Sequence, residues 1–219
     1  MRVMAVSGLH HSGKTTTLEH VVRELAGRGY SVGTVKSIHK EGFSIDTVGT
    51  NTHRHRMAGA SIVTAVSDCE TAVMMTRRAN YEEIISWYDT DWVVLEGAKD
   101  APYPRIVCAR TVGDIEACSD EHTFLICGPV AEEVDTWGGI PVVDARSRAR
   151  EVVDMAEKQI PHVASAGDRF ETAVHIDGEQ VALNPFTQDF VARTVLGMLS
   201  ALKDSSAHGH EVKIEIRRF

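Results

Sequence analysis

The stretch Gly8-Leu9-His10-His11-Ser12-Gly13-Lys14-Thr15 decides the fold of this protein. It matches the phosphate-loop pattern G-x-x-x-x-G-K-[ST] at every fixed position. The apolar run from Val3 to Val6 precedes the loop and predicts a buried parallel strand. Apolar residues with helical spacing follow the loop between Leu18 and Leu25. Strand, glycine loop and helix are the context that this motif requires, so the sequence predicts a binding site for a nucleoside triphosphate.

The loop residues have predictable chemical roles. The glycines let several backbone N–H groups point at one phosphate, and the helix amino terminus adds a favourable dipole. We expect Lys14 to reach the β and γ phosphates and Thr15 to hold Mg²⁺. His10 and His11 could contact a phosphate or simply occupy variable positions. The candidate nucleotide-binding residues of the loop are Gly8, His10, His11, Ser12, Gly13, Lys14, Thr15 and Thr16.

A bound metal ion also needs a carboxylate. Glu96 directly follows the apolar strand predicted from Trp92 to Leu95, and ligand sites of α/β folds lie at the carboxyl ends of such strands. Asp46, in the loop after the second predicted strand, is the alternative. Either residue could instead be a solvated loop acid, and position alone does not choose between these readings.

Two basic clusters lie near the predicted site, one around Lys36 and one from His53 to Arg56. Arginine binds phosphate with two parallel hydrogen bonds, so Arg54 and Arg56 could hold a second anionic ligand. The alternative is that the second cluster forms the exposed basic face of a helix entering Ala58.

The rest of the chain indicates an α/β fold with an open, mostly parallel sheet and helices on both faces, which is the architecture of a P-loop NTPase. Helices are expected over Tyr81 to Tyr88 and Ala145 to Lys158. The remaining strands are expected at Val32 to Val35, Ile62 to Val66, Val73 to Thr76, Ile106 to Ala109, Phe124 to Cys127 and Pro141 to Val143.

The composition changes between Pro161 and Arg169, which predicts a main domain over residues 1–165 and a small α+β module over residues 170–219. Asp177-Gly178 predicts a hairpin between strands near Val174 and Val181. Asn184-Pro185 predicts a helix start. The last strand is expected around Ile214. This module could serve for docking or dimerisation, or it could be a plain stabilising cap.

The net charge of -8 argues against a general nucleic-acid or anionic-membrane binder. The four cysteines form no C-x-x-C pair, which indicates reduced thiols in a reducing compartment. The first residues leave no room for a signal peptide, and no run is apolar enough to cross a membrane. We therefore expect a cytoplasmic protein.

Five runs together resemble the molybdopterin-guanine dinucleotide biosynthesis adapter protein B family. They match it in order and spacing across about the first 110 residues: Gly8 to Leu18, Val32 to His39, Phe43 to Gly49, His53 to Ala60 and Val94 to Lys99. The resemblance implies a GTP-binding protein with weak GTPase activity, usually a homodimer, in the conversion of molybdopterin to its guanine dinucleotide form. Its implied partners are the molybdenum cofactor guanylyltransferase and a molybdoenzyme apoprotein.

The resemblance also implies residue roles. Lys14 and Thr15 would bind phosphates and Mg²⁺, and Asp46 and Glu96 would lie near the metal. An anion-binding face, which could take molybdopterin as a second ligand, would be lined by Lys36, Arg54, Arg56 and Lys99. The chain departs from the family after Lys36, where the family commonly has a histidine-rich stretch. It also has no N-K-x-D motif, so guanine specificity depends on the resemblance.

Two other functions fit a phosphate loop. One is a small-molecule kinase, in which the basic cluster would hold the acceptor and a carboxylate would act as base. The other is a nickel-type metallochaperone GTPase, but the 11 histidines are scattered and no C-x-x-C pair is present.

Overall fold

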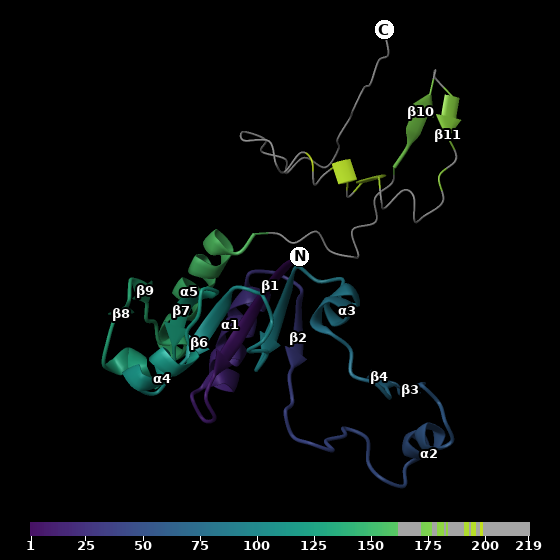
Figure 1. The fold of residues 1–219 in the computed structure, drawn as a ribbon, viewed down its shortest axis with the longest axis horizontal. Helices are drawn as coiled ribbons and strands as arrows, with labels where there is room; N and C mark the ends of the chain where they lie inside the picture. The colour runs from purple at the N-terminus through teal and green to yellow at the C-terminus, as the bar shows by residue number, and fades with distance from the viewer. Residues whose placement is uncertain are drawn as a thin grey trace. The chain divides into compact units, whose positions relative to one another are not determined.

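The computed structural model of the protein describes residues 1–161, 172–176, 179–181, 183, 191–192, 194–195 and 198 (Figure 1). The chain divides into two compact units, Met1–Gly167 and Asp168–Phe219. The phosphate-loop motif lies in the first unit.

The first unit is built on a five-stranded parallel sheet with strand order β2-β5-β1-β6-β7. The predicted mostly parallel α/β fold is therefore confirmed. The strand that leads into the phosphate loop lies in the centre of the sheet, where both of its edges are paired. The five strands are β1 (Arg2–Gly8), β2 (Val32–Lys36), β5 (Trp92–Glu96), β6 (Arg105–Cys108) and β7 (Thr123–Cys127).

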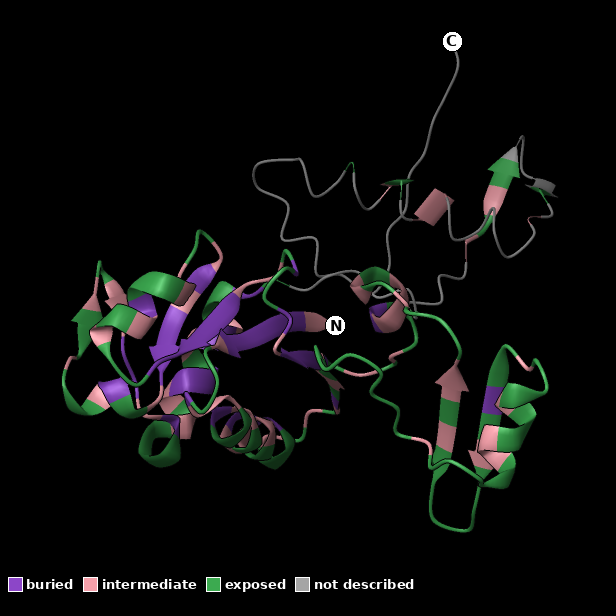
Figure 2. Cartoon of the chain, turned by 60° about the horizontal axis from the view of Figure 1, so that its bottom comes forward, coloured by how far each residue is buried: buried purple, intermediate pink, exposed green. Residues whose placement is uncertain are grey.

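Alternate residues of the strands pack against helices on opposite faces of the sheet. Met4, Val94 and Ile106 face one side, where they pack with α1 (Lys14–Gly27) and α5 (Ala145–Gln159). Val93 and Leu95 face the other side, with α3 (Tyr81–Ser86), and nearby Val107 packs with α4 (Val112–Cys118). Figure 2 shows that the buried residues are concentrated in these strands. Helices cover both faces, as predicted.

Two predicted strands do not join this sheet. β3 (Ile62–Val66) and β4 (Thr71–Met75) form a separate antiparallel hairpin, and α2 (Asn51–Met57) packs on β3. The four residues between the two strands allow a hairpin but are too few for the crossover that parallel pairing needs. Residues 51–75 form what we call the arm, whose residues are mostly exposed (Figure 2).

The remaining elements of the first unit are short. The 3₁₀ turn η1 spans Pro129–Glu132, and β8 (Thr136–Trp137) pairs antiparallel with β9 (Ile140–Pro141). The strand expected from Pro141 to Val143 is thus mostly absent, and Val142 makes an isolated parallel bridge to Ile126. The helix expected up to Tyr88 ends at Ser86, and α4 was not predicted.

The second unit contains the predicted hairpin, with β10 (Val174–Ile176) antiparallel to β11 (Glu179–Val181). Residues 191–192, 194–195 and 198 are helical. The predicted helix start at Asn184-Pro185 and the expected strand around Ile214 lie outside the described residues. Within the described ranges, no helix is both long and apolar enough to cross a membrane.

Candidate functional site

Three strands end together at the carboxyl edge of the sheet and position the candidate site. In the parallel register, Glu96 of β5 is paired with Val6 of β1 on one side and with Lys36 of β2 on the other. The phosphate loop begins two residues after Val6. The fold therefore brings the loop, the predicted metal carboxylate and one residue of the first basic cluster to one place, as the strand order requires.

The loop between β1 and α1 has a tightly turned backbone. Gly8 has φ 139°, and a Cβ atom there would lie 2.2 Å from the carbonyl oxygen of Cys108. Gly13 is left-handed, with φ 91°, and Gly13 O accepts the hydrogen bond from Thr17 N at 2.8 Å. Ser12 is fully buried, and its hydroxyl has no hydrogen-bond partner among the described residues. Both fixed glycine positions of the motif thus have a positive φ that favours glycine, and at Gly8 a side chain would also collide with Cys108 O.

The amino terminus of α1 is open to an anion. The N-cap residue Gly13 offers no side-chain acceptor, and the first turn contains no acidic residue. The first N–H groups of a helix have no intrahelical acceptor, and the helix dipole places partial positive charge there. A phosphate group would satisfy these donors.

A cavity of about 360 Å³ opens in front of this helix terminus. All of its lining residues are among the predicted site residues, which the fold brings together from three elements and the loop. They are His10, His11, Ser12, Gly13, Lys14, Thr15, Thr16, Lys36 and Glu96.

Glu96 contributes a buried carboxylate to this cavity, and two other lining residues bond to it. Its side chain is 8% exposed, and one carboxylate oxygen, Oε1, accepts two hydrogen bonds. The Thr15 hydroxyl donates to this oxygen at 2.8 Å, and the Lys36 ammonium forms an ion pair with it. Lys14 donates instead to the carbonyl oxygen of Leu9 within the loop. A hydroxyl and a carboxylate are hard oxygen donors, so Thr15 and Glu96 fit Mg²⁺.

Cys108 lies directly beneath the loop, because it is paired with Gly8 in the sheet register. Burial raises the pKa of this thiol to about 12, although a hydrogen bond with Thr17 and the charge of Lys14 oppose the rise. The thiol is therefore a neutral packing group beneath the site.

Gly128, which follows β7, supports the loop from the side and was not predicted. Its φ is 100°, and a Cβ atom there would lie 2.8 Å from the carbonyl oxygen of Ser12 and 2.5 Å from that of Ala109. A glycine directly after the predicted strand from Phe124 to Cys127 was the available sequence signal.

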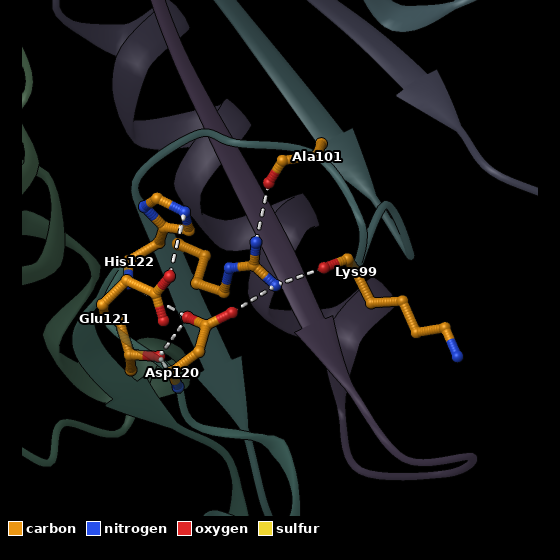
Figure 3. A network of polar contacts seen from close by, with 7 residues as sticks. Lys99, Ala101, Asp120, Glu121 and His122 are labelled. Carbon is orange, nitrogen blue, oxygen red and sulfur yellow. Dashed lines mark hydrogen bonds and ion pairs between the residues drawn. The ribbon is translucent and has the colours of Figure 1, made fainter.

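Arg105 fixes the loop that follows Glu96, and it too was not predicted. Its guanidinium donates to the carbonyl oxygens of Lys99 and Ala101, at 2.6 and 2.7 Å, and pairs with the Asp120 carboxylate at 3.1 Å (Figure 3). The residue is 3% exposed. Figure 3 shows that the Lys99 side chain points away from this network, and Lys99 does not line the cavity.

Four other predicted residues lie outside the cavity lining. One is Gly8 at the start of the loop, and the other three lie on or next to the arm. Asp46 accepts hydrogen bonds from Thr52 and Thr50, at 2.8 and 3.0 Å. Desolvation opposes ionisation of Asp46, but these hydrogen bonds and the charge of Arg56 lower its pKa overall. Arg56 also donates to Ser44 at 3.2 Å, and Arg54 lies on the last turn of α2. Through its hydrogen bonds to Thr50 and Thr52, Asp46 stabilises the start of α2.

The family comparison agrees with the sequence motifs. Residues 3–127 match the model of the family described as molybdopterin guanine dinucleotide synthesis protein B, MobB. The chain belongs to the MobB family. The match runs from the second residue of β1 to the end of β7, so it spans the central sheet and every residue of the cavity lining.

Several MobB relatives are similar over most of their length. The probable molybdopterin-guanine dinucleotide biosynthesis adapter protein of Bacillus subtilis is 31% identical over 65% of this chain and 85% of its own. The putative adapter protein of Methanocaldococcus jannaschii is 27% identical over 99% of this chain and 97% of its own, so its similarity includes the second unit. The crystal structure of Bacillus subtilis MobB superposes with a TM-score of 0.61 at 26% identity, covering 74% of this chain and 100% of that one.

Proposed function

We propose that this chain binds GTP with Mg²⁺ and acts as an adapter in the conversion of molybdopterin to its guanine dinucleotide form. The main support for nucleotide binding is the cavity, in which the open amino terminus of α1, Lys14 and the Thr15–Glu96 pair lie together. The pathway comes from membership of the MobB family and from the names of its adapter-protein relatives.

The cavity suits a triphosphate because its donors and charges are complementary to phosphate groups. The N–H groups of the loop and of the first helical turn are hydrogen-bond donors, and Lys14 and Lys36 supply two positive charges. Thr15 and Glu96 are the residues that would hold Mg²⁺, which neutralises phosphate charge. We assign slow GTP hydrolysis to this cavity, with Lys14 stabilising charge on the phosphates and Glu96 on the metal side.

We retain Asp46 as a candidate metal-side acid that acts only after a rearrangement. Asp46 now bonds to Thr50 and Thr52, and the segment from Ser37 to Thr50 would have to bring it to the cavity. If the Asp46→Asn variant binds GTP in Mg²⁺ with unchanged affinity, Asp46 has no role at the metal.

The test of the nucleotide proposal is calorimetric titration with GTP and with ATP, each with Mg²⁺. We expect selective GTP binding and, for Lys14→Ala, an affinity loss of about 100-fold, because a charge-assisted contact is removed. Lys158→Ala, at the exposed end of α5, is the matched control. Wild-type affinity in Lys14→Ala would refute the site. A preference for ATP, with phosphate transfer to an added pterin, would favour the kinase.

A second anionic ligand, molybdopterin, is proposed for the basic residues Arg54, Arg56 and Lys99. The two arginines lie on α2, away from the cavity lining, and α2 has no acidic residue in its first turn. We expect Arg54→Glu with Arg56→Glu to spare GTP binding and to weaken molybdopterin binding. Equal loss of both ligands would place these arginines at the nucleotide.

We also propose that the protein is a homodimer and that it acts with the guanylyltransferase and a molybdoenzyme apoprotein. The hairpin of the arm supports an interface, because α2 packs on β3 while Ile62, Val66 and Val73 remain 55%, 75% and 59% exposed. Exposed apolar patches mark contact surfaces. Sedimentation analysis should show a dimer that Val66→Lys converts to monomer. The four free cysteines suit a reducing compartment, so we expect the protein to act in the cytoplasm.

A further inference from the structure

The Glu96 carboxylate is held by two donors that come from different elements, α1 and β2. Glu96 Oε1 accepts the hydrogen bond of the Thr15 hydroxyl and the ion pair of the Lys36 ammonium. Lys36 and Glu96 are direct cross-strand partners in the parallel register of β2 and β5. The strand register therefore places these two residues side by side at the carboxyl edge of the sheet.

The two partners differ in how tightly they are held. The Glu96 side chain is 8% exposed, and a carboxylate so buried needs a nearby cation. The Lys36 side chain is 52% exposed and carries its charge on a flexible stem, so it can leave without unpacking the core. Lys14 bonds to Leu9 O. Among the described residues, the cation paired with Glu96 is the Lys36 ammonium.

We infer that Lys36 and a divalent cation compete for the Glu96 carboxylate, and that Lys36 thereby lowers the affinity of the site for that cation. The inference rests on the proposed triphosphate site. The Lys36 ammonium is bonded to Glu96 Oε1, so a divalent ion on this carboxylate would lie close to a second positive charge. The single negative charge of Glu96 cannot neutralise the ammonium and a divalent ion together. A displaced Lys36 stays in the cavity lining, where phosphate groups would replace the lost carboxylate as its anionic partner.

The backbone at Lys36 is anchored without its ammonium, so a structural role is separable from competition. Ser37 N donates to Glu96 O at 2.8 Å, and the Tyr81 hydroxyl donates to Ser37 Oγ at 3.0 Å. Removing the Lys36 charge should therefore leave the end of β2 in place and free the Glu96 carboxylate.

Mn²⁺ is a suitable probe, because electron paramagnetic resonance measures free Mn²⁺ directly, without nucleotide. We expect Lys36→Met and Lys36→Gln to bind Mn²⁺ about tenfold more tightly than the wild type, since a competing charge-assisted hydrogen bond is removed. Glu96→Gln in the Lys36→Met background should lose this gain. Lys158→Met, which removes an equal charge at the end of α5, should bind Mn²⁺ as the wild type does.

Mn²⁺ affinity in both Lys36 variants that is equal to or weaker than wild type would overturn the inference, as would a gain that survives Glu96→Gln. Parallel GTP titrations separate this result from the proposed function. Tighter Mn²⁺ binding without any GTP binding would support the competition and refute the nucleotide proposal. Normal GTP binding with unchanged Mn²⁺ affinity would refute the competition and leave the nucleotide proposal standing.

Discussion

Thr15 Oγ1 lies 2.8 Å from Glu96 Oε1, and this hydrogen bond joins the first turn of α1 to the end of β5 across 81 positions of sequence. The bond places a hydroxyl and a carboxylate side by side in the same cavity as Lys14. In this contact two of the three predicted metal-side residues meet, and the third, Asp46, is bonded elsewhere.

Thr15→Val should weaken GTP binding in Mg²⁺ by about tenfold, because valine keeps the shape of threonine and removes the oxygen that would hold the metal. GTP binding in excess EDTA should change much less. Calorimetry under both conditions makes the measurement, and the EDTA titration is its internal control. Equal losses in Mg²⁺ and EDTA would show that Thr15 acts on the nucleotide without the metal.

Gly8→Ala should destabilise the protein by about 3 kcal/mol or more, since the residue is left-handed and its new Cβ would collide with Cys108 O. Gly27→Ala is the matched control. Gly27 ends α1, and an added Cβ meets nothing within 4 Å, so we expect about 0.5 to 1 kcal/mol of stabilisation. Urea denaturation followed by circular dichroism measures both. Similar stabilities for the two variants would contradict the assigned backbone strain.

Arg105→Met should cost about 3 kcal/mol, because it leaves Asp120 and the carbonyl oxygens of Lys99 and Ala101 without their shared donor. Arg105→Lys should lose less, since lysine keeps the charge but cannot span the three acceptors. Urea denaturation of both variants tests this order. An Arg105→Met protein within 0.5 kcal/mol of wild type, or one more stable than Arg105→Lys, would contradict a role in holding this loop.

The Cys108 thiol should make stability depend on pH in the alkaline range. Burial raises its pKa from 9.0 to about 12, so the unfolded chain loses this proton first as the pH rises. The stabilising contribution is complete below pH 9 and disappears between pH 9 and about 12, at about 1.4 kcal/mol per pH unit.

The measurement is the difference in unfolding free energy between wild type and Cys108→Ala at several pH values. Other groups titrate in both proteins and cancel in this difference. We expect the difference to be constant up to pH 9 and then to move steadily in favour of the variant. A difference that stays constant up to pH 10.5 would show that the buried thiol does not titrate as stated.

The phosphate loop could be predicted because its information is local. Eight consecutive residues set the turn, and the apolar residues on either side set the strand and the helix. Glu96 was also within reach, since it ends a continuous apolar run and the carboxyl edge of a parallel sheet collects ligand residues. The prediction that β3 and β4 join the main sheet was wrong, because an apolar run predicts a strand but not the strand with which it pairs. The short connection from Ser67 to Glu70 was the signal that could have separated this hairpin from the sheet.

The sequence by itself determined that this chain has an α/β fold with a phosphate loop, because backbone conformation and hydrophobic periodicity are properties of neighbouring residues. Only the tertiary structure decided which distant residues share the site. Strand order and register place Lys36 beside Glu96, bring Gly128 against Ser12, and bury Arg105 where it holds the loop of Lys99. Such contacts depend on the packing of the whole sheet, and no local pattern encodes them.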